Sequence, residues 1–125
     1  NLSFVGDGDT YLTGNSTFGG YTYFDGIGLT FVSGSINGGT NGRFIVGNTN
    51  SGVSLAFTGG GTNAADSMQI GNTNTSSNNT VIVDGATLTL VNTFGVGAKG
   101  NSGNSCAESC ICKAFLLICT LLNNF

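Results

Sequence analysis

The carboxylates of this chain are the residues whose types and spacing are best suited to chemistry. Asp7 and Asp9 lie on either side of Gly8 in a turn-forming stretch. Two carboxylates on one turn offer the oxygen ligands that calcium prefers. Asp25 and Asp84 each precede a glycine within two similar stretches. If those stretches stack two coils apart, the two carboxylates lie roughly 10 Å apart, near the upper limit for the acid pair of an inverting glycosidase.

Each acidic pair also has a purely structural interpretation. The segment GDGDTYLTG at residues 6–14 resembles one copy of the RTX nonapeptide repeat, whose turns bind calcium in stacked copies, and one copy is visible. Asp before Gly is a common turn pair, and no basic residue stands beside Asp25 or Asp84 in the sequence. We therefore predict turn roles for Asp25 and Asp84, no catalytic residues, and Asp7 and Asp9 as the candidate metal site.

The composition restricts both the fold and the function. Only 7% of the residues are charged, against about 25% in an ordinary globular domain. The net charge of −3 leaves no basic stripe for nucleic acid, and the absence of His removes the commonest general base and metal ligand. With 39% hydrophobic residues the chain can form a core, so disorder is not expected. The 22 Gly, with many Asn, Ser and Thr, indicate short strands and tight polar turns.

Short runs of alternating apolar and polar residues recur along the chain, most clearly in TVIVDGATLTLVNTFGVG at residues 80–97. Such alternation is typical of half-buried strands. An apolar-x-apolar-Gly element has its second apolar residue at Val46, Ile70 and Val96. The intervals, about 24 and 26 residues, fall in the range of solenoid repeats.

Aligning these repeats predicts which residues lie above one another. The expected columns are Phe44/Met68/Phe94, Val46/Ile70/Val96, Phe57/Val83 and an amide ladder Asn48/Asn72. The same alignment places Asp25, Thr58 and Asp84 in one column. It also matches Leu29–Val32 to Leu88–Val91, and sets Thr62 and Ala64 level with Leu88 and Leu90.

One such unit cannot bury its apolar face alone, whereas stacked units can. We therefore predict an all-β fold over residues 1–104, a parallel β-helix or β-solenoid of about four coils, with successive coils about 4.8 Å apart. The alternative is an antiparallel β-sandwich or jelly roll, which is also built from short strands.

Residues 105–125 form a Cys-rich apolar tail that contains all four cysteines, at positions 106, 110, 112 and 119. Ser105 and Glu108 have capping-box spacing, which predicts a short helix over about Cys106–Leu122. Its uninterrupted apolar part, residues 114–119, is too short to cross a bilayer. The cysteine spacing does not match a zinc site. Three interpretations stay open: a cap on the solenoid, an end that is not native sequence, and a metal or redox role.

The segments VIVDGATLTLVNTFGVG, FIVGNTNSGVSLAFTGGG and MQIGNTN resemble the passenger repeats of bacterial autotransporters and related large surface adhesins. The likeness covers about residues 21–104. It implies a right-handed parallel β-helix that is exported and acts as an extracellular or cell-surface stalk or adhesin. The tail departs from these Cys-poor passengers, and a start at Asn1 without Met or a signal peptide leads us to expect a processed chain or a piece of a longer one.

We accordingly expect a non-enzymatic structural or adhesive segment whose partners are cell-surface glycans or a protein receptor. One alternative is a filament subunit, because open solenoid ends expose strand edges for end-to-end association. Another is a solenoid that binds ice or carbohydrate. Its candidate residues are the Thr-x-Thr pairs and the exposed tyrosines: Thr73/Thr75, Thr87/Thr89, Tyr11, Tyr21 and Tyr23. Glycosylation sequons occur at Asn15, Asn74 and Asn78. No cofactor other than calcium is expected.

Overall fold

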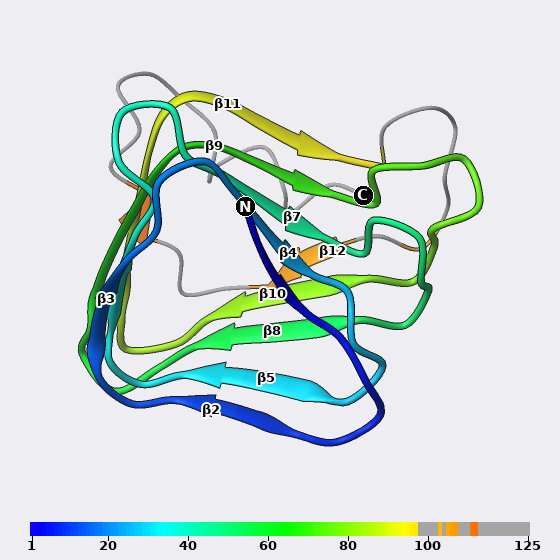
Figure 1. The fold of residues 1–125 in the computed structure, drawn as a ribbon, viewed down its shortest axis with the longest axis horizontal. Helices are drawn as coiled ribbons and strands as arrows, with labels where there is room; N and C mark the ends of the chain where they lie inside the picture. The colour runs from blue at the N-terminus through cyan, green and yellow to red at the C-terminus, as the bar shows by residue number, and fades with distance from the viewer. Residues whose placement is uncertain (98–102, 104, 108–110, 113–125) are drawn as a thin grey trace.

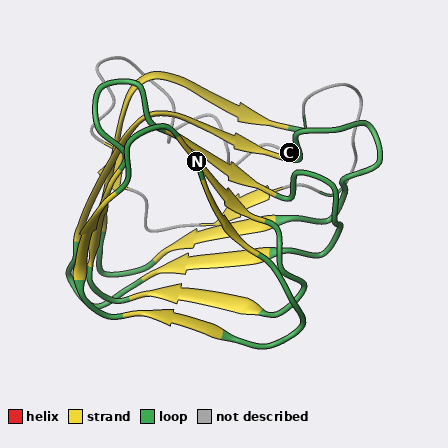
Figure 2. Cartoon of the chain, in the orientation of Figure 1, coloured by secondary structure: helices red, strands yellow, loops and turns green. Residues whose placement is uncertain are grey.

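The computed structural model describes residues 1–97, 103, 105–107 and 111–112. These residues form a β-solenoid in which all strand pairs are parallel (Figures 1 and 2). The strands are β1 (Leu2–Phe4), β2 (Thr10–Leu12), β3 (Asn15–Thr17), β4 (Tyr21–Phe24), β5 (Leu29–Val32), β6 (Ser35–Asn37), β7 (Arg43–Val46), β8 (Ser54–Phe57), β9 (Thr62–Ile70), β10 (Thr80–Val83), β11 (Thr87–Val96), β12 (Ser105–Ala107) and β13 (Ile111–Cys112). The solenoid prediction is confirmed and the antiparallel sandwich is wrong.

The coils enclose a triangular cross-section with three faces (Figure 1). Face A contains β1, β4, β7 and the second halves of β9 and β11. Face B contains β2, β5, β8, β10 and β12. Face C contains β3, β6, the first halves of β9 and β11, and β13. With the N-terminal coil nearest the viewer, the chain runs clockwise as it recedes, so the solenoid is right-handed (Figure 1).

The turns between faces differ in length and composition. The first corner, from face A to face B, is short in the first two coils, at residues 5–9 and 25–28, and longer in the next two, at residues 47–53 and 71–79. The second corner joins face B to face C through short Gly-containing turns. At the third corner, from face C back to face A, β9 and β11 pass around the bend without a break in the strand assignment, with a register shift between Leu90 and Thr93.

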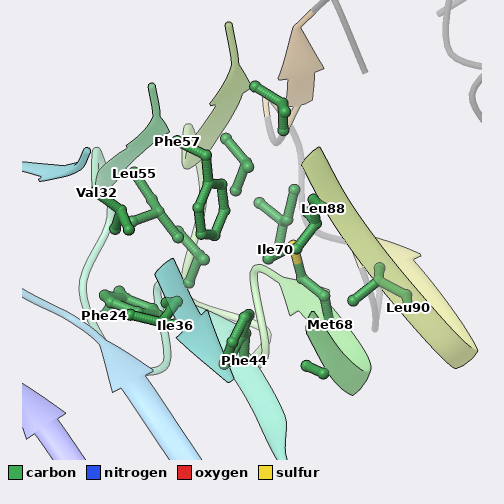
Figure 3. Packing of buried hydrophobic residues seen from close by; sticks show 14 of the residues in the cluster. Phe24, Val32, Ile36, Phe44, Leu55, Phe57, Met68, Ile70, Leu88 and Leu90 are labelled. Carbon is green, nitrogen blue, oxygen red and sulfur yellow. The ribbon is translucent and has the colours of Figure 1, made fainter. Parts of the chain in front are cut away.

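The core consists of columns of apolar side chains that follow the coil axis. Phe44 pairs in register with Met68 and Met68 with Phe94. Val46, Ile70 and Val96 form the next column, which Phe24 and Phe4 extend toward the N-terminus. On face B, Val32, Phe57 and Val83 are in register. Figure 3 shows the buried members of these columns packed against one another inside the triangle. The predicted hydrophobic columns are therefore confirmed.

At the N-terminal end the core is only partly covered. Phe4, Leu12 and Phe18 pack on the buried cluster but are themselves half-buried. Phe4 stacks on Phe24 with ring centroids 5.3 Å apart and nearly parallel planes. No described strand pairs with the outer edge of β1. End-to-end association through such an edge stays a prediction.

The predicted match of Leu29–Val32 to Leu88–Val91 is wrong. Leu29–Val32 is β5 on face B and pairs with Ser54–Phe57, whereas Leu88 and Leu90 lie on face C. The predicted alignment of Leu88 and Leu90 with Thr62 and Ala64 is also wrong by one residue, because Leu88 pairs with Asn63 and Leu90 with Ala65. Each face presents the same period-two pattern, so alternation alone does not identify the face to which a strand belongs.

The predicted helix over Cys106–Leu122 is wrong for its described residues. Ser105–Ala107 forms β12, which pairs with β10, and Ile111–Cys112 forms β13, which pairs with β11. The stacked sheets thus offer backbone partners that outweigh the capping-box signal. Residues 108–110 and 113–125 lie outside the described residues. Among those that are described, no helix is long and apolar enough to cross a membrane.

Candidate functional surfaces

The carboxylate of Asp25 accepts hydrogen bonds from several groups of the next coil at the first corner. Its Oδ1 accepts hydrogen bonds from the backbone nitrogens of Asn48, Thr49 and Asn50 at 2.7, 3.0 and 3.0 Å. Its Oδ2 accepts from the Thr49 nitrogen at 3.2 Å and from Thr49 Oγ1 at 2.7 Å. Consecutive backbone N–H groups that converge in this way form an anion-binding concavity. The Gly47–Asn50 loop therefore binds a carboxylate that belongs to the coil before it.

A second polar network ties the next loop to its neighbour. Ser76 and Asn79 are fully buried. Ser76 Oγ lies 2.5 Å from the carbonyl oxygen of Gly47, and Asn79 Oδ1 accepts a hydrogen bond from the Val53 nitrogen at 2.9 Å. Asn72 Nδ2 donates to Asn48 Oδ1 at 2.8 Å, so the predicted amide ladder is confirmed. Sequence reasoning missed Ser76 and Asn79, because a run of Ser and Asn is typical of an exposed loop.

Asp25 and Asp84 do not share a column, so the alignment on which a catalytic pair would depend is wrong. Asp25 follows β4 at the first corner, where its nitrogen donates to the Phe4 carbonyl. Asp84 follows β10 at the second corner, where its nitrogen donates to the Phe57 carbonyl. Its column is Ser33, Thr58 and Asp84, since the Thr58 nitrogen donates to Val32 in the same manner. The two carboxylates therefore lie at different corners of the triangle.

The candidate calcium ligands Asp7 and Asp9 both lie in the exposed first-corner turn of the N-terminal coil. Asp9 Oδ1 accepts a hydrogen bond from the Leu29 nitrogen at 2.9 Å. The next coil places Ile27 and Leu29 beside this turn, and its one acid at this corner, Asp25, is hydrogen-bonded to the Asn48–Asn50 loop. Within the described part of the chain, no group of three or more His, Cys, Asp or Glu side chains forms a metal cluster. Calcium binding by Asp7 and Asp9 stays a prediction.

Exposed apolar side chains gather over the first two coils, and we call them the apolar patch. They come from the first corner and from the outer side of face B: Val5, Tyr11, Ile27 and Leu29, with the half-buried Phe31 between them. Tyr11 is 65% exposed and stacks on Phe31, with centroids 5.2 Å apart and planes 10° from parallel. Phe31 therefore covers one face of the Tyr11 ring. Exposed apolar patches of this kind often mark binding surfaces.

The other candidate tyrosines lie on the outer side of face A. Tyr21 is exposed and Tyr23 is half-buried, and their rings meet edge to face with centroids 6.2 Å apart. The sequon residues Asn15, Asn74 and Asn78 are all exposed. Asn78 has a positive φ of 55°, a conformation that Asn tolerates better than most residues.

Face C carries an outer surface of a different kind, which we call the polar face. From β3 to β11 its outward positions carry short, uncharged side chains in two columns: Asn15, Ser35, Thr62, Thr87 and Thr17, Asn37, Ala64, Thr89. Thr87 and Thr89 thus belong to a regular array, whereas Thr73 and Thr75 lie in the first-corner loop, with their hydroxyls 3.2 Å apart. Neighbouring rungs are about 4.8 Å apart, and the two columns about 6.7 Å apart, by strand geometry.

Comparison with known proteins adds no relative. No family model, curated protein or solved structure matches this chain. The likeness to autotransporter passenger repeats remains one of sequence pattern, and the fold itself is a right-handed parallel β-solenoid.

Proposed function

We propose that this chain is a non-catalytic structural and adhesive module, a stiff β-solenoid segment that works outside the cell. The observation that supports this most is the use made of its carboxylates. Asp9 binds the Leu29 nitrogen, Asp25 binds the Asn48–Asn50 loop, and Asp66 accepts from Asn92 Nδ2 at 2.6 Å. Each of these bonds joins one coil to the next. Three carboxylates that an enzyme could use for acid–base chemistry instead accept the hydrogen bonds that hold neighbouring coils together.

The apolar patch is the adhesive surface of this proposal, and its ligand is a glycan. The free face of an aromatic ring matches the C–H side of a pyranose, and Tyr combines an apolar ring with a polar hydroxyl. Tyr11 is the largest exposed member of the patch, and Asp7 and Asp9 supply carboxylates on the neighbouring turn. Tyr is among the residue types that most often contribute a large share of the binding energy at an interface.

A glycan array probed with the wild-type chain and with Tyr11→Ala tests the adhesive role. Wild type is expected to bind a subset of glycans, and Tyr11→Ala to lose affinity by at least about tenfold. Thr89→Ala, on the polar face, is the matched control and is expected to bind as wild type does. Binding that survives Tyr11→Ala contradicts the patch as the site. An array without any bound glycan leaves a passive stalk as the role of the segment.

A second candidate function is the binding of ice through the polar face. The specific observation is the regular two-column array of Ser, Thr, Asn and Ala side chains on face C. Hydroxyls and methyls held at fixed spacings order the first layer of water, because each bridging water is fixed by its partners. Charged residues are absent from this array, which keeps the surface uniform.

Ice-growth measurements separate the second candidate from the first. If the polar face binds ice, the wild-type chain shapes growing ice crystals, and Thr89→Lys abolishes the effect because a long charged side chain interrupts the array. Tyr11→Ala is the control and is expected to leave ice shaping unchanged. Ordinary crystal growth in the presence of the wild-type protein would exclude this function.

A further inference from the structure

The loop between β6 and β7, residues 38–42, projects from the third corner of the second coil (Figure 1). The two Asn-Gly pairs of the chain stand at its start, Asn37-Gly38, and at its end, Asn41-Gly42. Asn followed by Gly is the pair most open to internal attack, because glycine has no side chain to block the approach of its nitrogen. We propose that Asn41 is a site of spontaneous deamidation, and that the fold protects Asn37.

The reaction needs only the chain and water. The Gly42 backbone nitrogen attacks Asn41 Cγ, a C–N bond forms, the Cγ–Nδ2 bond breaks, and ammonia leaves with the proton from the Gly42 nitrogen. Water then opens the resulting succinimide ring at either carbonyl and produces aspartate or isoaspartate. The net change is the replacement of a carboxamide by a carboxylate, with the release of one ammonia.

Asn41 meets the conditions for this attack. Its side chain is exposed and makes no hydrogen bond with the described residues. The Gly42 nitrogen has only a long contact, 3.4 Å, to the Gly39 carbonyl, which is weak as a hydrogen bond. Both the electrophilic carbon and the attacking nitrogen are therefore held loosely.

Asn37 has the same following residue and the opposite environment. It lies within β6, and its Oδ1 accepts a hydrogen bond from the Gly39 nitrogen at 2.8 Å. The nitrogen that would attack, that of Gly38, donates to the Ala64 carbonyl at 2.8 Å. Two ordinary hydrogen bonds must break before Asn37 reacts, which slows it on the order of tenfold or more relative to Asn41.

The glycine that makes Asn41 labile is required by the fold. A Cβ at position 42 would overlap the backbone of Gly38. The Gly42 carbonyl accepts the Asp66 nitrogen at 2.8 Å, which ties the loop to the next coil. Deamidation therefore places a new negative charge near Asp66 at the edge of the polar face.

The experiment incubates the folded protein and the urea-unfolded protein in the same mildly alkaline buffer. Mass spectrometry with fragmentation that separates positions 37 and 41 follows both sites over time. In the unfolded chain both are expected to react at similar rates, whereas in the folded protein Asn41 reacts about tenfold faster or more than Asn37. Asn41→Gln removes the fast reaction, and Asn37→Gln leaves it unchanged. Equal rates in the folded protein, faster reaction at Asn37, or a folded Asn41 that stays intact while the unfolded chain reacts would each overturn the proposal.

Discussion

Two loops of the first corner have the same four residues, Gly-Asn-Thr-Asn, and make different contacts. In Gly47–Asn50 the backbone nitrogens of the last three residues bind the Asp25 carboxylate. In Gly71–Asn74 the Asn72 nitrogen donates to the Gly47 carbonyl, and the Asn72 amide donates to Asn48. Asp25 lies below Gly47, and Gly47 lies below Gly71. The coil underneath, rather than the loop's own residues, therefore decides how the loop is held.

Asp25→Ala removes the carboxylate that holds the Gly47–Asn50 loop, and we expect it to lower the free energy of unfolding by about 3 kcal/mol or more. The substitution removes the acceptor of three backbone N–H groups and of the Thr49 hydroxyl in part-buried bonds. Hydrogen bonds to a charged group contribute about 1.5–3 kcal/mol each, and the exposed Thr49 and Asn50 can recover part of the loss from water. Urea unfolding followed by circular dichroism measures the loss.

Asp84→Ala is the matched control for this change. Asp84 is exposed, and its side chain has no hydrogen bond with the described residues. Its removal is therefore expected to change stability by no more than about 0.5 kcal/mol. Similar losses for the two variants would refute the idea that the loop depends on the carboxylate beneath it.

Gly47→Ala breaks the contact between the two loops and is expected to cost about 2 kcal/mol or more. Gly47 has a φ of +71°, and a Cβ there would overlap the Asn79 side chain. Gly52→Ala isolates the two causes, since Gly52 has a φ of +73° but no heavy atom within 4 Å of its added Cβ. That variant should lose only about 1 kcal/mol, the backbone term alone. Equal thermal destabilisation of both would show that Asn79 moves aside without cost.

The smallest expected effect concerns the amide ladder. A double-mutant cycle of Asn48→Ala and Asn72→Ala is expected to return a coupling of about 0.5–1 kcal/mol, because one neutral side-chain hydrogen bond in a partly buried position links them. Equilibrium unfolding of the four proteins supplies the values. Strictly additive losses would mean that the bond contributes nothing to stability.

The sequence predicts correctly those parts of the fold in which similar residues recur at regular intervals. Val46, Ile70 and Val96 stack as expected, and so do Asn48 and Asn72. Both sets rest on residues that recur at nearly constant intervals within one face. Asp25 and Asp84 were matched instead by their shared Asp-Gly turn, and that turn occurs at two different corners.

Only part of the polar face and of the apolar patch can be predicted from the sequence. The sequence offers Thr87 and Thr89 as candidate binding residues, but their partners on the polar face include Asn15, Ser35 and Asn37, which do not repeat the Thr-x-Thr motif. Tyr11 was recognised as an exposed aromatic residue, whereas its stacking on Phe31 depends on the register of β2 with β5. The register is set by how neighbouring coils pair, and the composition of a strand does not reveal it.

By itself the sequence determined the class of fold. Low charge, abundant Gly and Asn, and apolar pairs that recur at coil-length intervals favour stacked parallel strands over other uses of the same residues. Only the tertiary structure decided the partners. It placed Asp25 beneath Asn48–Asn50, hid Ser76 and Asn79, and separated Asp25 from Asp84. The physical reason is that local pattern sets which side of a strand is buried, whereas the coil above or below sets what each turn residue binds.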